Sequence, residues 1–313
     1  MDGLTQRRIL PDSYLISLGR KFTLLGKKVI IFETACKHQV YLINRFEDIN
    51  MLVIPSDVVQ IYEKHTKVRK DFYNLERDKI LELEGNLEVY GGIGLKSVND
   101  LFSNAHLKSL NLNNFYTDNV VDFSHMFYNA GIEEVDISML NTSNALTFKG
   151  MFKHAVIDDI KIGSIDTRKV NSMADMFRHC TINDEIDLSG LDTQALENTY
   201  GMFRGACIRD IKFGGFNTSN VTNMRSMFFK LSIGAETLDV SNFKTNKVER
   251  MDDMFKNLVT LRGEKPLDLR NFELSNVIST TGMLYEAHKD VLASDKLMKA
   301  IIRREPTCRE IEV

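Results

Sequence analysis

A Met-Phe dipeptide returns along this chain at a nearly constant interval of 25 to 27 residues. Degenerate copies, Leu101-Phe102 and Met283-Leu284, flank the complete ones. A fixed period of this size indicates stacked supersecondary units, each of which buries its apolar face against its neighbours. The chain is therefore predicted to form a solenoid, an elongated architecture that is more typical of binding than of catalysis. The complete copies are Met126-Phe127, Met151-Phe152, Met176-Phe177, Met202-Phe203, Met227-Phe228 and Met254-Phe255.

Each repeat begins with a short apolar alternation, such as Ile132, Val135 and Ile137. This spacing predicts a short strand with one buried face. Three residues after the strand comes a further apolar column, which is expected to lie where the chain turns under the core. Its members are Phe115, Leu140, Ile165, Leu191, Phe216, Phe243 and Phe272.

A threonine follows two residues later in six repeats, from Thr117 to Thr245. Threonine is a frequent helix N-cap because its hydroxyl accepts a hydrogen bond from an N–H group of the first turn. The next apolar residues fall at i, i+3, i+6 and i+7, as in Val120, Phe123 and Met126-Phe127. We therefore expect a short helix whose apolar stripe faces the sheet.

The run from Ile208 to Phe228 combines the apolar strand spacing with Phe-x-Thr-Ser-Asn-Val-x-x-Met-x-x-Met-Phe. This pattern resembles the BspA-type leucine-rich repeat of bacterial surface proteins and lipoproteins, and it extends over about residues 80–285. The resemblance implies an α/β solenoid, a leucine-rich-repeat-like arc with a parallel sheet on one face and short helices on the other. Many BspA-type relatives are adhesins.

The segments outside the repeats are expected to form a separate module and two caps. Residues 1–79 contain four apolar, β-branched-rich runs that suggest an antiparallel meander, followed by a helix that opens at Pro55. This segment is predicted as a small α+β module. A solenoid also needs polar ends. We assign residues 80–102 to an N-terminal capping repeat, 103–285 to seven repeats, and 286–313 to a C-terminal tail with a capping helix from Asp290 to Ile302.

Cysteine usage and hydropathy indicate the cellular compartment in which the protein is expected. The four cysteines form no C-x-x-C pair and have no histidine at zinc-ligand spacing, so neither a metal knuckle nor a disulfide framework is indicated. The N-terminus lacks the apolar core of a secretory signal, and no apolar stretch is long enough to cross a membrane. We expect a cytoplasmic protein without a membrane partner.

No enzyme signature is present: the sequence lacks G-x-S-x-G, H-E-x-x-H and the P-loop. We therefore expect no catalytic residue, no cofactor and no metal. His154 and His179 occupy the same position one repeat apart, but no third ligand recurs beside them. Cys180 stands in a column that otherwise holds alanine, which favours a buried, inert thiol.

The outward positions of the strands carry mostly carboxylates. Residues 1–79 hold 14 Lys and Arg against 10 Asp and Glu, a net charge of +4. Because the whole chain has a net charge of −3, residues 80–313 carry a net charge of −7. Neighbouring strands lie ~4.8 Å apart, so these residues should form an acidic stripe broken by two lysines. The candidate partner contacts are Glu134, Asp136, Asp159, Lys161, Glu185, Asp187, Asp210, Lys212 and Asp239.

Two basic features accompany the acidic stripe. The position after Phe reads Tyr128, Lys153, Arg178, Arg204, Phe229 and Lys256, and we interpret its cations as partners of helix C-termini rather than as a phosphate track. The N-terminal module carries the one basic run that could invite a nucleic acid or an acidic partner. Its candidate contact residues are Lys64, Lys67, Arg69 and Lys70.

Together these patterns predict a non-enzymatic, intracellular protein-protein recognition module whose acidic open sheet face binds a partner with a basic surface. Nucleic acid is expected only through the N-terminal basic run. One alternative is a mobile-element or viral inhibitor that occludes a nucleic-acid-handling enzyme. Another is a surface adhesin whose leader was removed.

Overall fold

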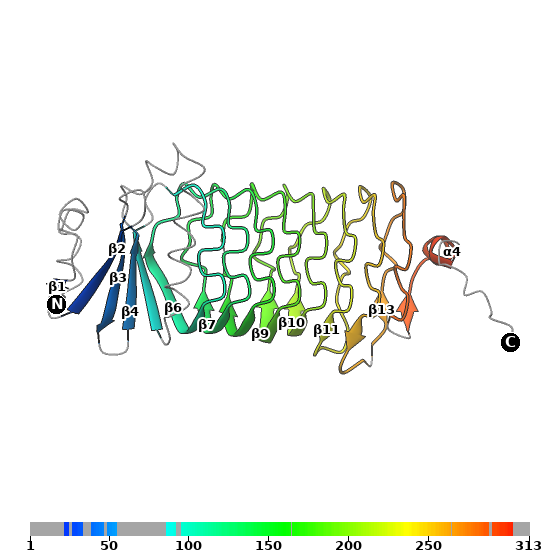
Figure 1. The fold of residues 1–313 in the computed structure, drawn as a ribbon. Coiled ribbons are helices and arrows are strands. Elements are labelled where there is room, and N and C mark those ends of the chain that lie inside the picture. The colour runs from blue at the N-terminus through cyan, green and yellow to red at the C-terminus, as the bar shows by residue number, and fades with distance from the viewer. Residues whose placement is uncertain are drawn as a thin grey trace, which may run out of the picture.

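The repeats wind into a parallel β-solenoid of about eight turns (Figure 1). The computed structural model of this protein describes residues 22–24, 27–33, 39–46, 49–54, 86–91, 95–163, 165–263, 265–287 and 290–302. The turns of the coil contribute one strand each to a sheet that runs along the lower side of Figure 1, up to β12 (Val259–Thr260), and the last two strands, β13 (Leu267–Asp268) and β14 (Val291–Leu292), form a separate small sheet. The turns stack from the N-terminal to the C-terminal end in sequence order.

The strands of the solenoid pair in parallel, each with the equivalent strand of the next repeat. Their inward residues match the predicted alternation: Ile132, Val135 and Ile137 are each no more than 2% exposed. The strands are β5 (Asn86–Gly91), β6 (His106–Phe115), β7 (Gly131–Asp136), β8 (Val156–Lys161), β9 (Thr181–Asp187), β10 (Cys207–Lys212), β11 (Ser232–Ile233) and β12 (Val259–Thr260).

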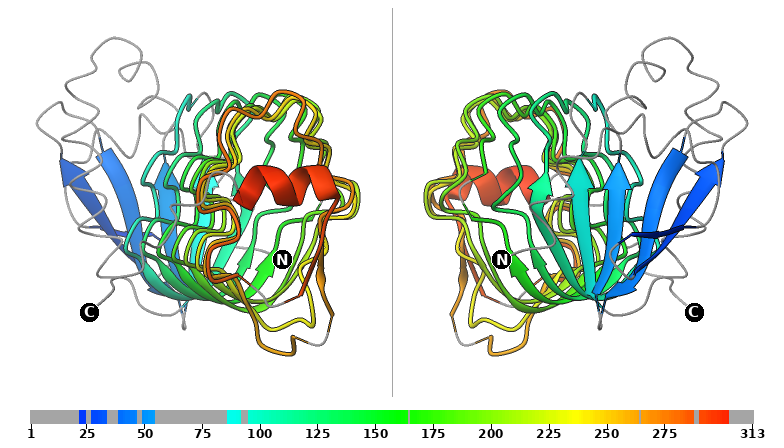
Figure 2. Two further views of the ribbon diagram at one scale, coloured as in Figure 1. Left: turned by 90° about the vertical axis from the view of Figure 1, so that its right-hand side faces the viewer. Right: turned by 90° about the vertical axis from the view of Figure 1, so that its left-hand side faces the viewer.

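Four N-terminal strands extend the same sheet. They are β1 (Phe22–Leu24), β2 (Lys27–Glu33), β3 (Gln39–Phe46) and β4 (Ile49–Ile54). Each of these strands pairs with the next in antiparallel orientation, as expected for the predicted meander. Strand β4 then pairs in parallel with β5. In the end views, β2 to β4 fan out to one side of the coil (Figure 2). The helix expected from Pro55 lies outside the described residues, so the α+β module stays a prediction.

The expected short helices of the repeats are absent from the described residues, and this part of the α/β prediction is wrong. An α-helix requires hydrogen bonds from N–H to the carbonyl four residues earlier. In residues 117–130 the N–H groups instead alternate between a carbonyl three residues earlier, as in Met126 to Phe123, and the next repeat, as in Phe127 to Met151. Isolated parallel bridges join equivalent residues of successive repeats, from Ser97 to Ser279.

Left-handed backbone at two positions of each repeat interrupts any helix. His125 has φ 56° and Asn129 has φ 54°, and equivalent residues share this conformation in the other repeats. Non-glycine residues adopt it only singly, because a left-handed run is costly. The segment is therefore a succession of tight corners. Apolar side chains at every third or fourth position of the segment point into the core. Val120, Phe123 and Met126 are fully buried.

The threonine column links repeats instead of capping helices, which corrects the second sequence interpretation. Each hydroxyl donates to the carbonyl of the residue that precedes the equivalent position in the next repeat, which is threonine in all cases except Leu274. Thr193 Oγ1, for example, lies 2.9 Å from the Asn217 carbonyl oxygen and also accepts from the Asn217 N–H at 2.6 Å. These threonines are at most 3% exposed. The column thus satisfies backbone groups that the core would otherwise leave unpaired.

Substitution of Thr193 by valine is expected to lower the free energy of unfolding by ~1 to 3 kcal/mol, because it preserves shape but leaves the Asn217 N–H and carbonyl without this partner. Urea denaturation measures the loss. The control is Thr222→Val, an exposed threonine whose hydroxyl lies 3.4 Å from the Glu197 carbonyl, where a change within ~0.5 kcal/mol is expected. Equal losses in both variants would contradict the assigned role.

Phenylalanine rings stack through the whole core. The rings of Phe102, Phe127, Phe152, Phe177, Phe203, Phe228 and Phe255 follow one another with centroids 5.1 to 5.7 Å apart and interplanar angles of 3 to 16°. This step is close to the ~4.8 Å between neighbouring strands. The turns stack along a nearly straight axis instead of the expected arc (Figure 1).

The C-terminal cap is shorter than the sequence predicted. Helix α4 (Asp295–Ile302) begins after Ser294, whose hydroxyl accepts from the Leu297 N–H at 3.3 Å. Leu297 and Ile301 are buried, and the helix lies across the end of the coil (Figure 2). Residues 291–292, expected to begin this helix, instead form β14 (Val291–Leu292), which pairs in parallel with β13 (Leu267–Asp268). None of the helices in the described part of the chain could cross a membrane.

Candidate functional site

Eight of the nine candidate contact residues lie on β7 to β10, where the structure brings them together on the outer face of the sheet. Glu134 is the register partner of Asp159, and Asp136 that of Lys161. On the next pair of strands, Asp210 faces Glu185 and Lys212 faces Asp187. The remaining candidate, Asp239, follows β11 and is exposed. The second set, Lys64, Lys67, Arg69 and Lys70, lies outside the described residues.

Several of these carboxylates stabilise the turn that follows their strand. Asp136 Oδ1 accepts from the Ser138 N–H at 2.9 Å, Asp187 Oδ1 from the Ser189 N–H at 2.9 Å, and Asp239 Oδ1 from the Ser241 N–H at 3.0 Å. Hydrogen bonds from the Ser189 hydroxyl and N–H lower the pKa of Asp187 below its ordinary value. These three residues therefore have a structural role in addition to their outward position.

Cations of β10 neutralise one edge of this face. Lys212 Nζ lies 2.7 Å from Glu185 Oε1, and Arg209 Nη1 lies 3.4 Å from Asp184 Oδ1. Both pairs are largely exposed, so each contributes little to stability. These two pairs compensate Asp184 and Glu185 of β9.

Sequence reasoning missed a full column of outward residues. Between the first two buried residues stand two outward positions in β6, β7, β8 and β10 and three in β9, not one. The extra residue of β9 shifts its register against β10 between Ile208 and Asp210. The spacing of three between Ile132 and Val135 was the available signal. The missed residues are Lys108, Glu133, Asp158, Asp184 and Arg209.

Together the two sets define an acidic patch on β7, β8 and β9, which carry eight carboxylates against one lysine, Lys161. Asp158 accepts from the Asn183 side chain at 2.6 Å. Glu133, Glu134 and Asp159 make no side-chain hydrogen bond or ion pair with any other described residue. A surface of this kind attracts cations and repels phosphates. The carboxylates are Glu133, Glu134, Asp136, Asp158, Asp159, Asp184, Glu185 and Asp187.

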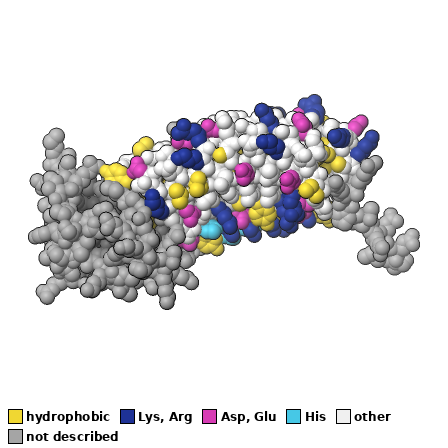
Figure 3. Space-filling model, turned by 90° about the horizontal axis from the view of Figure 1, so that it is seen from above, with side chains coloured by type: hydrophobic (Ala, Val, Ile, Leu, Met, Phe, Trp, Pro, Cys, Tyr) yellow, Lys and Arg dark blue, Asp and Glu magenta, His cyan; other side chains and the backbone are white. Residues whose placement is uncertain are grey.

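The basic column after Phe does not complement helix termini, because no helix ends there. Two of its cations bind carboxylates of their own repeat: Arg178 with Asp175 at 3.3 Å and Lys256 with Asp253 at 3.2 Å. Arg204 instead lies over the Phe229 ring, with its Cζ 4.5 Å from the centroid. Lys and Arg side chains intermix with Asp and Glu over the face seen in Figure 3.

His154 and His179 stack in parallel at the left-handed corner, with ring centroids 5.1 Å apart. Burial lowers the pKa of both imidazoles, and Arg178 lowers them further. Within the described residues, His, Cys, Asp and Glu nowhere gather in a group of three that could hold a metal ion. Cys180 is buried, and burial raises the pKa of its thiol, as expected of an inert core residue.

The lowered histidine pKa values predict that acid weakens the fold. A group whose pKa is lower in the folded state stabilises the protein above its unfolded pKa of ~6.5 and loses that contribution as the pH falls. The chain should therefore be less stable at pH 5 than at pH 7. Replacing His154 and His179 by asparagine, which occupies this column at Asn129 and Asn257, should reduce the difference. Urea denaturation at both pH values tests this; an unchanged difference would refute it.

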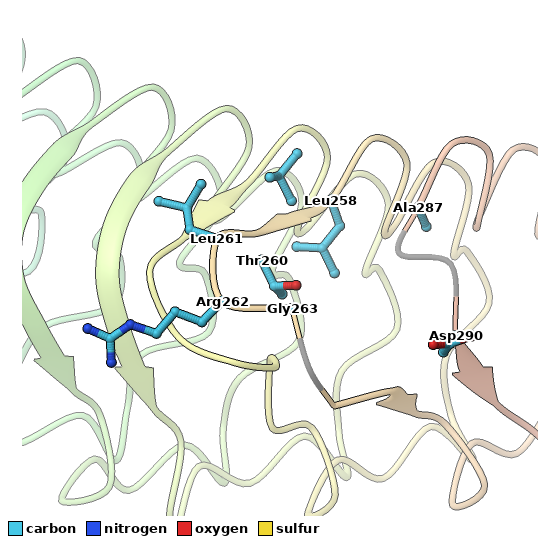
Figure 4. Close-up of a pocket in the computed structure, with 8 residues that line it drawn as sticks. Leu258, Thr260, Leu261, Arg262, Gly263, Ala287 and Asp290 are labelled. Carbon is cyan, nitrogen blue, oxygen red and sulfur yellow. The ribbon is translucent and has the colours of Figure 1, made fainter.

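A hollow of about 510 Å³ lies where the main sheet ends at β12 (Figure 4). Residues 258–263 line one side of it, and Ala287 and Asp290 come from the following turn. Two apolar side chains, Val259 and Leu261, are 49% and 68% exposed. The lining holds no pair of acid and base that would suggest catalysis, and we assign no site to it.

The comparisons agree with a repeat protein. Three overlapping stretches, residues 66–187, 96–211 and 176–294, match the family model described as "Mycoplasma protein of unknown function, DUF285". The overlap of the stretches reflects the internal period, because one model aligns at several positions along the coil. No curated protein and no solved structure matches the chain at a significant level. Since the matched stretches span residues 66 to 294, well over half of the sequence, the chain belongs to the DUF285 family of Mycoplasma proteins of unknown function.

Proposed function

We propose that the protein is a non-enzymatic recognition module and that its acidic patch binds a protein partner with a basic surface. The observation that carries this proposal is the density of charge on β7, β8 and β9, where eight carboxylates stand against Lys161. A rigid parallel sheet fixes these side chains relative to one another, so little ordering is needed when a partner binds.

The chemistry of the patch selects the partner. Glu133, Glu134 and Asp159 lack partners among the described side chains, so they are free to accept from lysine or arginine. Complementary charge speeds association and makes it sensitive to salt more than it raises affinity. A lysine- and arginine-rich protein surface fits these properties.

The experiment is affinity capture from native cells, with mass spectrometry, at low and high salt. The patch variant is Glu134→Lys with Asp159→Lys, which reverses one exposed and one half-buried charge of paired strands, neither of which carries a turn hydrogen bond. The control is Glu197→Lys with Glu249→Lys, which makes the same change of charge at two exposed residues away from the strands. We expect a salt-sensitive partner that the patch variant loses and the control retains.

Other outcomes would contradict the proposal. Capture that is insensitive to salt, or that both variants lose equally, would mean that the acidic patch does not carry the interaction. If the patch variant still captured the partner and the control variant did not, the interface would lie on another face of the coil.

An inhibitor is a second candidate, because a dense row of carboxylates can occupy a channel that binds phosphates. Its signature would be co-purification of a nuclease or helicase that Asp187→Lys with Asp210→Lys releases. Asp187 also holds a turn, so the melting temperature of this variant must be compared with that of the parent. The relation to BspA-type repeats, and with it a role at the cell surface, rests on the sequence pattern and is likewise a proposal.

A further inference from the structure

A second charged surface lies at the two left-handed positions on either side of the Met-Phe pair in five successive repeats. We call it the basic corner and define it as residues 149–154, 174–179, 200–205, 225–230 and 252–257. It carries seven cations against three carboxylates. The cations are Lys149, Lys153, Arg178, Arg204, Arg225, Lys230 and Lys256.

Ion pairs inside the described structure neutralise all three carboxylates of this corner. Asp175 binds Arg178, Asp253 binds Lys256, and Asp252 binds Arg250 at 3.1 Å. Five cations of the basic corner form no ion pair with a described residue. They are Lys149, Lys153, Arg204, Arg225 and Lys230. The corner therefore has an excess of positive charge that the described part of the chain does not balance.

Aromatic rings lie between these cations and form two groups. In the first, Tyr128 packs edge-on against His125 and His154, with centroids 5.8 and 5.6 Å away, and His154 stacks on His179. In the second, the Phe229 ring has Arg204 at 4.5 Å and Lys230 at 5.5 Å from its centroid. All of these rings keep part of their surface exposed, unlike the phenylalanines of the core stack.

Three cations gather around Phe229, and within the described structure only one of them, Lys256, has a carboxylate partner. Lys256 Nζ is a third cation near this ring, at 5.8 Å. Each cation–π contact is favourable, but like charges held together repel one another unless an anion joins them. Burial lowers the pKa of His154, and the nearby charges of Lys153 and Arg178 lower it further.

We propose that the basic corner binds single-stranded nucleic acid, with its cations contacting phosphates and its exposed rings stacking on bases. Proteins that bind single strands combine a basic track with aromatic platforms in this way. Five repeats at ~4.8 Å per step give a track about 19 Å long, enough for a short oligonucleotide. The rings favour unpaired bases, because bases inside a duplex cannot stack on a side chain. The basic corner is distinct from both the acidic patch and the Lys64–Lys70 run, so this proposal stands independently of the proposed function.

The test measures fluorescence anisotropy of a labelled ~20-nucleotide oligothymidine with the full chain at several salt concentrations. The corner variant is Arg204→Glu with Lys230→Glu. The matched control is Lys108→Glu with Lys161→Glu, which makes the same change of charge at two exposed lysines of the sheet face. We expect at least tenfold weaker binding by the corner variant and less than twofold change in the control. Loss of two phosphate contacts should also reduce the slope of log K against log salt by ~1.4.

A second variant separates stacking from charge. Phe229→Leu replaces the aromatic ring with an apolar side chain that cannot stack on a base. It should weaken oligothymidine binding about fivefold or more. Binding of heparin, a polyanion without bases, should stay unchanged. Equal effects on both ligands, or no effect on either, would overturn the stacking role and with it the nucleic-acid assignment.

Several results would overturn the proposal as a whole. These are the absence of oligothymidine binding at low salt, equal loss in the corner and control variants, or binding that only Lys67→Glu with Arg69→Glu abolishes. Association with anionic vesicles but not with oligothymidine, or equal competition by duplex DNA, would likewise contradict a site for single strands.

Discussion

Replacement of Phe177 by alanine is expected to lower the free energy of unfolding by ~3 to 5 kcal/mol. Phe177 is fully buried at the middle of the ring stack, with Phe152 at 5.4 Å on one side and Phe203 at 5.3 Å on the other. The substitution removes both ring contacts and opens a cavity that neighbouring turns cannot close, because each is fixed by backbone bonds to the next. Chemical denaturation measures the loss.

The effect should also spread along the coil. Each repeat contacts only its neighbours, so destabilising one turn weakens the support of the turns beside it. Hydrogen exchange should therefore quicken first in residues 150–155 and 201–206 and less toward either end. The control is Tyr116→Ala, a residue 37% exposed, which should change stability far less. An unchanged melting temperature for Phe177→Ala would show that the stack does not carry the core.

The repeat period and the buried face could be predicted from the sequence because both are properties of apolar spacing. Phe123, Met126 and Phe127 were assigned to the core, and all three are fully buried. The conformation was missed. The spacing i, i+3, i+6, i+7 differs from the i, i+4 periodicity of a helix, and it fits corners closed by bonds to the third preceding residue.

The threonine column shows why local chemistry misled the interpretation. A threonine before an apolar run is an N-cap signal when the helix satisfies its own backbone. In a solenoid the next repeat supplies an alternative acceptor, and Thr167 donates to the Asp192 carbonyl at 2.7 Å. Nothing in the sequence of a single repeat distinguishes a helix N-cap from a threonine that bonds to the next repeat, because the carbonyl that accepts the bond lies 25 residues away.

The sequence predicted that the candidate contact residues point outward from their strands, as they do on β7 to β10, but it could not separate their roles. Asp136 and Glu134 look equivalent as outward acids, yet Asp136 accepts from the Ser138 N–H and Glu134 has no described side-chain partner. The patch extends to Glu133 and Asp158 only because each strand has two adjacent outward positions, which strict alternation does not allow. Whether the patch binds a protein is a separate question that the capture experiment addresses.

The glycine at position 214 should tolerate no side chain, and Gly214→Ala is expected to cost ~2 to 5 kcal/mol. Its φ of +35° is unfavourable for alanine, which contributes a cost of ~1 to 2 kcal/mol. An added Cβ would also lie 2.3 Å from Ser189 Cβ and 3.0 Å from Ser189 Cα in the preceding repeat. These atoms can move only if the backbone moves, so the two turns must separate, at a cost of ~1 to 3 kcal/mol.

A double-mutant cycle separates the two costs. Ser189→Gly removes the clashing Cβ, so the variant Gly214→Ala with Ser189→Gly should recover ~1 to 2 kcal/mol relative to the sum of the single changes, while the backbone cost remains. Gly190→Ala is the matched control, since an added Cβ there would lie 3.7 Å from the nearest heavy atom, the Gly163 carbonyl oxygen. Its free energy of unfolding should change by no more than ~0.5 kcal/mol. If Gly190→Ala and Gly214→Ala proved equally stable, close stacking of successive turns at this corner would be ruled out, because that stacking is what distinguishes the two glycines.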